Sequence, residues 1–138
     1  MLADVRPTPQ RDGVRVTRLL IVDDHVAVRQ GLQQMFATVP GIEVVGMAAD
    51  GCQAIIQADR LRPDVVLMDV EMPNVDGIEA TRRITTTHPT SRVVILTASD
   101  DRSRIQDALR AGATSYVPKH SDPDHVVRAV QDARPEGT

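Results

Sequence analysis

The sequence predicts an α/β fold in which a doubly wound parallel sheet of five strands alternates with five helices. Short apolar runs recur along the chain, stretches with helical spacing of apolar residues separate them, and residues that favour helix starts stand at several junctions. Strands and helices that alternate in this way imply right-handed crossovers and helices on both faces of the sheet. The expected strand order is 2-1-3-4-5.

The expected strands are short runs rich in Val, Ile and Leu. Because polar residues do not alternate with the apolar ones, each run is typical of a parallel strand that is buried on both faces. The five runs are Leu19–Val22, Val44–Ala48, Val65–Met68, Val93–Leu96 and Tyr116–Val117.

Apolar residues at helical spacing follow the first, second, fourth and fifth runs. They include Val28, Leu32, Met35, Phe36 and Val39, then Ala54, Ile55, Ala58 and Leu61, then Ile105, Ala108 and Leu109, and finally Val126, Val127 and Val130. Helix starts are expected at Asp50, at Asp100 or Asp101, and within Ser121–Asp124, where Pro123 suits the first helical position.

Length and composition favour one globular domain without a nucleic-acid surface. The 138 residues carry a net charge of -3, with no Trp, one Phe and one Tyr, so both a basic patch and an aromatic stacking platform are lacking. Cys52 is the single cysteine, which excludes a disulfide within the chain and suits a reducing cytoplasm. A cytoplasmic location is therefore expected.

The expected domain organisation has three parts. Residues 1–17 should form a disordered tail that lacks the apolar region of a signal peptide, residues 18–133 should form the folded domain, and residues 134–138 should be a tail or the start of a linker. The chain contains no apolar run of about 18 residues, so no contact with a membrane is expected.

Three carboxylates are expected to meet at one edge of the sheet. Asp23 and Asp24 follow the first strand, and Asp69 closes the third, so in this strand order they flank the point where ligands bind in open α/β sheets. Two such charges about 4 Å apart repel by about 4 kcal/mol. A divalent cation, Mg²⁺ above all, would relieve this repulsion. The alternative is that these residues only cap a helix and end a strand.

A hydroxyl and an ammonium are expected at the same edge. Thr97 follows the fourth apolar run and Lys119 follows the fifth. Together with a metal held by carboxylates, these groups suit the binding of a phosphoryl group, whose transfer depends mainly on positioning and charge neutralisation. The natural nucleophile is a carboxylate, by way of an aspartyl phosphate. The alternative for Lys119 is a solvated surface lysine.

Four stretches, "LLIVDDH", "DVVLMDVEMPNVDGIEATRRI", "VVILTAS" and "SYVPKHS", together resemble the receiver domain of two-component response regulators. The resemblance covers about Thr17 to Ala133 and is most similar to the NarL/FixJ, or LuxR-type, branch. It implies a flavodoxin-like, CheY-like fold in which Asp69 accepts a phosphoryl group from a phosphohistidine on a sensor histidine kinase. Such a domain is not an enzyme beyond its own phosphorylation and dephosphorylation.

The resemblance also implies a role for each candidate residue. Asp24 and Asp69 would ligate Mg²⁺ directly, Asp23 would act through water, and the backbone carbonyl of Glu71 would complete the protein ligands. Lys119 would pair with the phosphoryl oxygens. For His25, a role as metal ligand is rejected, because Mg²⁺ prefers oxygen and a neighbouring side chain generally points elsewhere.

A conformational switch is the expected output. The resemblance implies that Thr97 swings toward the phosphoryl group and that Tyr116 follows, although Tyr116 could instead serve core or edge packing. The face made by the helix at about Asp101–Ala111, the fifth strand and the helix at about Pro123–Asp132 should then change most. This face is the expected site of homodimer formation or of contact with an output domain.

The position of Pro118 departs from the family pattern, in which Lys is commonly followed by Pro, so a cis Lys–Pro bond is not inferred. LuxR-type regulators usually continue into a helix-turn-helix domain, whereas this chain ends at "ARPEGT". The expectation is either the receiver of a transcription regulator, which would contact DNA only through a helix-turn-helix domain outside this chain, or a stand-alone receiver that acts by protein contact.

Two other classes share parts of the pattern. A haloacid-dehalogenase-type phosphatase also uses Mg²⁺ and an aspartyl phosphate, but its nucleophile follows the first strand, whereas Asp69 follows the third. A flavodoxin-like flavin protein would need a phosphate loop rich in Ser, Thr and Gly after the first strand and aromatic rings beside the flavin. The sequence has neither feature.

Overall fold

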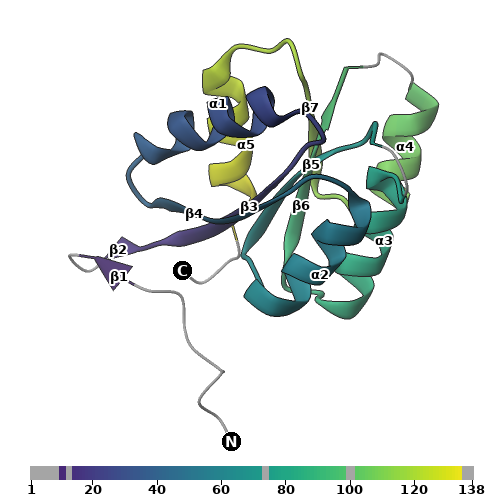
Figure 1. Cartoon of the computed structure of the whole chain (residues 1–138), viewed down its shortest axis with the longest axis horizontal. Helices are drawn as coiled ribbons and strands as arrows, with labels where there is room; N and C mark the ends of the chain where they lie inside the picture. The colour runs from purple at the N-terminus through teal and green to yellow at the C-terminus, as the bar shows by residue number, and fades with distance from the viewer. Residues whose placement is uncertain (1–9, 12–13, 73–74, 99–101, 135–138) are drawn as a thin grey trace, which may run out of the picture.

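Five parallel strands form the central sheet of the computed structural model, which describes residues 10–11, 14–72, 75–98 and 102–134 (Figure 1). The strands are β3 (Thr17–Val22), β4 (Ile42–Ala48), β5 (Val65–Asp69), β6 (Arg92–Thr97) and β7 (Ser115–Pro118). They lie in the order β4-β3-β5-β6-β7, and each neighbouring pair is parallel. Numbered among themselves, they have the predicted order 2-1-3-4-5, so the predicted fold is confirmed.

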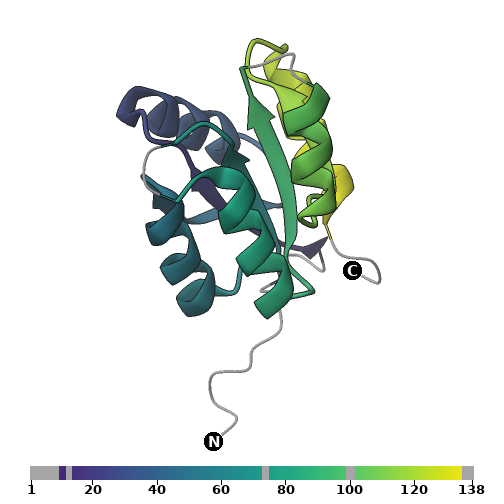
Figure 2. The ribbon, with the colours of Figure 1, turned by 90° about the vertical axis from the view of Figure 1, so that its right-hand side faces the viewer.

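Helices cover both faces of this sheet. They are α1 (Val26–Ala37), α2 (Gly51–Leu61), α3 (Gly77–Thr87), α4 (Arg102–Arg110) and α5 (Pro123–Ala133). Helices α1 and α5 lie on one face, and α2, α3 and α4 lie on the other (Figures 1 and 2). None of the helices within the described residues has the length and apolar character that crossing a membrane requires.

Local signals explain two of the helix starts. The Asp50 side chain accepts a hydrogen bond from the backbone N–H of Gln53 at 2.8 Å, as predicted for an N-cap. Helix α5 has Asp122 as its N-cap and Pro123 in its first turn. The predicted cap of α4, Asp100 or Asp101, lies outside the described residues.

The sheet has a hydrophobic core on each of its two faces, and the strands contribute side chains to both cores. Because successive residues of a strand point to opposite faces, Leu20 and Val22 pack toward α2, α3 and α4, whereas Leu19 and Ile21 pack toward α1 and α5. Phe36 of α1 is fully buried in the second of these cores. Every residue of the central strand β5 is buried, as predicted from its unbroken apolar run.

The N-terminal boundary differs from the prediction. Strand β1 (Gln10–Arg11) pairs antiparallel with β2 (Val14–Arg15), and both Val16 and Thr17 are buried, so ordered structure begins before residue 18. Val16 alone links β2 to β3, and Thr17 N–H donates to the carbonyl of Gly41 at 2.8 Å. Strands of two residues are too short to show a periodic pattern. The rest of the expected tail, residues 1–9 and 12–13, lies outside the described residues.

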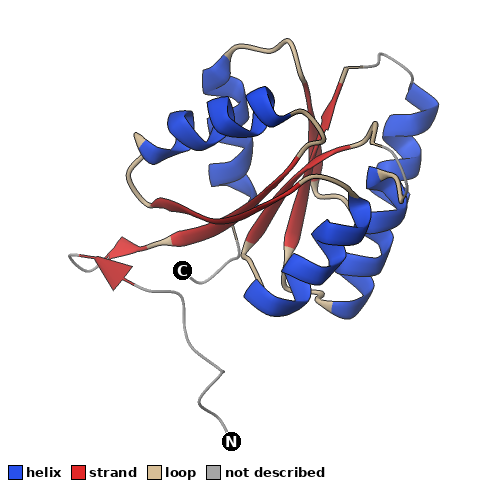
Figure 3. Cartoon of the chain, viewed as in Figure 1, coloured by secondary structure: helices blue, strands red, loops and turns tan. Residues whose placement is uncertain are grey.

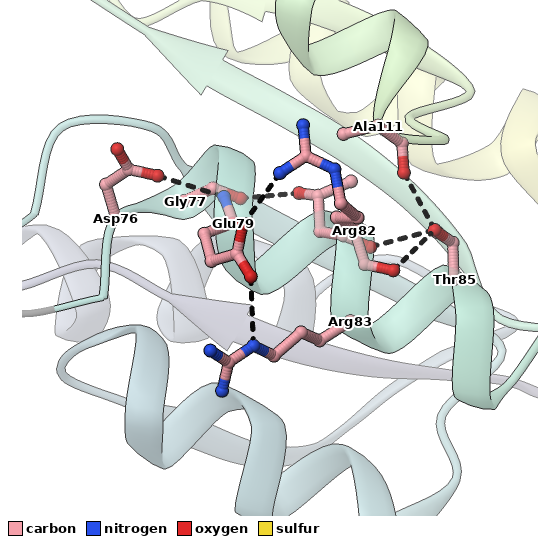
Figure 4. Close-up of polar contacts among 8 residues, drawn as sticks. Asp76, Gly77, Glu79, Arg82, Arg83, Thr85 and Ala111 are labelled. Carbon is pink, nitrogen blue, oxygen red and sulfur yellow. Dashed lines mark hydrogen bonds and ion pairs between the residues drawn. The ribbon is translucent and has the colours of Figure 1, made fainter.

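The end of α3 is tied to the turn that follows α4. The Thr85 hydroxyl lies 2.8 Å from the carbonyl oxygen of Ala111 and 2.9 Å from that of Thr81 (Figure 4). Gly112 has a φ of 116°, and a Cβ there would overlap the Thr85 side chain. Glycine therefore allows this close approach of the two helices.

The parallel strands end together at one edge of the sheet, where loops lead into the helices (Figure 3). This arrangement brings side chains that are far apart in the sequence to one site.

Candidate functional site

Two buried carboxylates lie side by side at this edge. Val22 of β3 is opposite Met68 of β5, so the residues that follow them, Asp23 and Asp69, are neighbours. Both have no solvent exposure. Asp23 Oδ1 accepts the backbone N–H of His25 at 2.9 Å, and Asp69 Oδ1 accepts that of Glu71 at 3.1 Å. Each carboxylate is thus fixed through one oxygen and presents the other.

Lys119 reaches the second oxygen of both carboxylates. Its Nζ lies 3.0 Å from Asp23 Oδ2 and 3.0 Å from Asp69 Oδ2. The residue follows β7, and its backbone N–H donates to the Thr97 carbonyl at 2.8 Å, which holds the loop against the end of β6. The structure thereby rules out the alternative of a solvated surface lysine.

Burial and charge shift the protonation of this group. Burial raises the pKa of Asp69 to about 6, and the neighbouring Asp23 charge adds to the rise, although the hydrogen bond and charge of Lys119 oppose it. For Lys119, burial alone would lower the pKa, but the hydrogen bonds and charges of Asp23 and Asp69 outweigh burial and raise it.

The carboxylates form a cluster that suits a cation. Ligand atoms of Asp23, Asp24, His25 and Asp69 lie within 4.8 Å of one another. Three oxygens, Asp23 Oδ2, Asp24 Oδ1 and Asp69 Oδ2, are buried and make no hydrogen bond of good geometry with the described residues. Lys119 Nζ lies 3.0 Å from Oδ2 of both Asp23 and Asp69, and His25 Nδ1 lies 3.0 Å from Asp24 Oδ1. Buried carboxylate oxygens this close together fit a hard divalent cation that prefers oxygen ligands.

The placement of His25 corrects the sequence analysis. The ring does not point elsewhere, because Nδ1 lies 3.1 Å from Asp23 Oδ1 and 3.0 Å from Asp24 Oδ1. His25 is the N-cap of α1 and has an extended backbone, with φ -97° and ψ 118°. Its backbone N–H donates to Asp23 Oδ1 at 2.9 Å, so both the N–H and the ring contact Asp23.

Thr97 and Tyr116 have different surroundings. Thr97 is the last residue of β6 and is 2% exposed, next to Leu96, which pairs with Asp69. Thr97 therefore ends the strand that neighbours β5, at the edge where Asp69 also lies. Tyr116 lies in the edge strand β7 and is 45% exposed, which rules out core packing but leaves edge packing.

Helix α3 begins directly against the end of β5. Gly77 N–H donates to the Val70 carbonyl at 3.0 Å, and a Cβ on Gly77 would overlap the backbone carbonyl of Asp69. Asp76 caps the helix by accepting the Glu79 N–H at 2.9 Å (Figure 4). Glycine is therefore required for α3 to sit this close to Asp69.

Glu79, one turn into α3, pairs with two arginines of the same helix. Its carboxylate lies 2.7 Å from Arg82 Nη1 and 3.0 Å from Arg83 Nε (Figure 4). These i,i+3 and i,i+4 pairs stabilise the helix modestly. The carboxylates of the site are contacted by Lys119 and His25 instead.

The sequence analysis missed Arg104. This residue of α4 lines an open hollow together with Asp24, Val70, Glu71, Met72 and Asp76. No motif marks Arg104 among the arginines of its segment. Its position four residues before the buried Ala108 was the available signal, because residues four apart share one face of a helix.

Comparison with known proteins agrees with this geometry. Residues 19–131 match the family model of the response regulator receiver domain. The transcriptional regulatory protein DegU of Brevibacillus brevis is 38% identical over 114 residues, which are 83% of this chain and 48% of that protein. The chain thus spans about half the length of such relatives.

Solved structures give the same result. A two-component response regulator of the LuxR family from Aurantimonas sp. SI85-9A1 has a TM-score of 0.81 and 38% identity, covering 85% of this chain and 84% of that chain. CheY in the CheX-CheY-BeF3-Mg+2 complex from Borrelia burgdorferi has a TM-score of 0.79 and 30% identity, covering 87% and 90%. The chain belongs to the receiver domain family of two-component response regulators.

Proposed function

We propose that Asp69 is the phosphoacceptor of this receiver and that its donor is a phosphohistidine on a sensor histidine kinase. The observation that carries the proposal is the position of Lys119, whose ammonium contacts Oδ2 of both Asp23 and Asp69. A buried carboxylate beside a cation and a second carboxylate has the charges needed to attack a phosphoryl group and to stabilise its oxygens.

In the proposed reaction, an Asp69 carboxylate oxygen attacks phosphorus. The bond between phosphorus and the histidine nitrogen breaks, and the imidazole leaves with the electron pair. Lys119 would then pair with the phosphoryl oxygens, and the Thr97 hydroxyl would donate to one of them. Asp23, Asp24, Asp69 and the Glu71 carbonyl would hold Mg²⁺, which neutralises charge on the phosphoryl oxygens when bound.

The proposed output is a change of the face made by α4, β7 and α5. Thr97 and Tyr116 lie at or near the ends of β6 and β7 and would be the moving residues. Because DegU is a transcriptional regulatory protein and this chain matches about half of it, we propose that the receiver controls transcription. DNA contact would come through a helix-turn-helix domain, with homodimer formation or contact with that domain at this face. A stand-alone receiver is the second candidate.

A cytoplasmic location completes the proposal. Cys52 is exposed and free, and a reducing compartment suits such a thiol. The kinase that donates the phosphoryl group would then share this compartment.

The test is phosphorylation by a small donor. Acetyl phosphate or phosphoramidate with Mg²⁺ should add one acid-labile phosphoryl group per chain, measured by intact mass spectrometry. Asp69→Asn should abolish the addition, whereas Asp132→Asn, at an exposed position of α5, should retain it. A label on Ser, Thr or His would contradict the proposal, and many turnovers per chain would instead indicate a phosphatase.

A further inference from the structure

Arg104 carries a buried donor without a partner. Its Nε is inaccessible to solvent and makes no hydrogen bond with the described residues. Buried N–H groups are nearly always paired, so an unpaired one has room for a partner such as water, an anion or a ligand. The guanidinium lines a hollow whose other polar members, Asp24, Glu71 and Asp76, are all acidic.

The hollow adjoins the reacting groups. Its lining includes Asp24, which belongs to the carboxylate cluster, but neither Asp69 nor Lys119. Lys119 reaches the inner oxygens of Asp23 and Asp69. Arg104 comes instead from α4, which lies beside α3 on the opposite side of the sheet from α5 (Figure 1). Arg104 therefore borders the carboxylate cluster, through Asp24, from another element than Lys119, and a leaving group at the hollow would meet its guanidinium.

We propose that Arg104 binds the anionic leaving group of an acyl phosphate donor and so determines which small phosphodonors this receiver uses. The inference rests on the proposed phosphorylation of Asp69. A guanidinium suits this task because its planar N–H groups match the two oxygens of a carboxylate.

Acetyl phosphate and phosphoramidate release different leaving groups, and this difference distinguishes binding of the leaving group from a general effect of Arg104 on phosphorylation. In both, an Asp69 oxygen forms a bond to phosphorus. With acetyl phosphate, the bond from phosphorus to the bridging oxygen breaks, and acetate leaves as an anion with the electron pair. With phosphoramidate, the phosphorus–nitrogen bond breaks, and the protonated nitrogen leaves as neutral ammonia. A cation at the leaving group stabilises the first departure and not the second.

The experiment compares the two donors at saturating Mg²⁺. Arg104→Gln should lower the rate of phosphorylation by acetyl phosphate about tenfold, as expected for one charge-assisted hydrogen-bonded pair, and change the phosphoramidate rate less than twofold. Arg104→Lys should recover part of the loss. Arg110→Gln, at an exposed position of the same helix, is the matched control and should leave both rates unchanged. Rates are read by intact mass spectrometry.

A second variant tests whether Arg104 acts only by offsetting the negative charge of Glu71, which lines the same hollow. In the double variant with Glu71→Gln, the deficit with acetyl phosphate should persist, and its disappearance would overturn the proposal. Equal losses with both donors would also overturn it, as would no loss with either. Failure of the proposed function would look different, because the parent chain would then gain no phosphoryl group or Asp69→Asn would still gain one.

Discussion

The ammonium of Lys119 lies 3.0 Å from Oδ2 of Asp69 and the same distance from Oδ2 of Asp23. One cation therefore serves two fully buried carboxylates, with Asp24 close by. The site carries surplus negative charge until a proton or another cation joins it. This imbalance determines how stability should respond to pH, to metal and to loss of the lysine.

Stability without metal should fall as the pH rises from about 4 to 6. The pKa of Asp69 is raised from 3.8 to about 6 in the folded state, so over this range the folded chain holds a proton that the unfolded chain has released. The free energy of unfolding should decrease by about 2 kcal/mol, since solvent near the open site screens part of the charge. Urea melts in EDTA measure this.

Asp69→Asn provides the reference for this measurement. In this variant the free energy of unfolding should not decrease between pH 4 and 6. The difference in free energy of unfolding between the parent chain and the variant should therefore change with pH in this range and be constant above pH 7. If the free energies of unfolding of the two proteins changed with pH in parallel over the whole range, the pKa of Asp69 would not be raised in the folded state.

Loss of Lys119 should be costly at neutral pH. Lys119→Gln leaves two buried carboxylates without their cation, and removing one partner of a buried ion pair costs about 3–5 kcal/mol. The cost should shrink at pH 5, where Asp69 takes up a proton, and adding Asp69→Asn should restore part of the stability. Arg128→Gln, exposed on α5, is the control. An equal effect of Lys119→Gln at pH 5 and pH 8 would contradict this account.

Millimolar Mg²⁺ should stabilise the folded chain. A hundredfold excess over the dissociation constant adds about 2.7 kcal/mol, which raises Tm by about 10 °C for a domain of this size. Asp24→Ala should remove most of the shift, whereas Asp132→Ala should retain it. If Asp24→Ala responds to Mg²⁺ like the parent chain, the metal assignment is wrong.

Gly77→Ala should disturb both stability and the site. Because the added Cβ would meet the backbone of Asp69 and Val70, α3 must move, at a cost of about 1–3 kcal/mol. Phosphorylation of Asp69 should slow as well. Gly31→Ala is the matched control, because that glycine lies within α1 with nothing within 4 Å of the added atom, and the change should stabilise by about 0.5–1 kcal/mol. Equal effects of the two variants would contradict the prediction.

Beryllofluoride, a mimic of the phosphoryl group, should alter amide exchange most in α4, β7 and α5. A ligand changes a distant surface only by favouring one of two arrangements, and Thr97 is the buried residue between the carboxylates and this face. Thr97→Ala should therefore reduce the change. If beryllofluoride changed amide exchange only in α2 and α3, the conformational switch would not lie in α4, β7 and α5.

The sequence predicted the sheet order and the carboxylate cluster because both depend on local patterns. Unbroken apolar runs identify buried parallel strands, and residues that follow such strands share one edge. This rule predicts which residues share the edge, namely Asp23, Asp69, Thr97 and Lys119.

The remaining features depend on distances between elements, which local patterns do not contain. The direction of the His25 ring depends on the backbone at one helix cap. The approach of Arg104 to Asp24 depends on how α4 lies beside the loops that follow β3 and β5. The exposure of Tyr116 depends on β7 being an edge strand rather than a central one.

The hydrogen bond between Thr85 and Ala111 has a mechanical consequence for α4. A helix that is fastened at its C-terminal end and keeps that fastening can swing but cannot slide along its axis. In α4 the fastened end is near Ala111, and Arg102 lies at the opposite end of the helix. A swing of α4 would therefore displace its first turn, which carries Arg104, more than its last turn, which is held to α3.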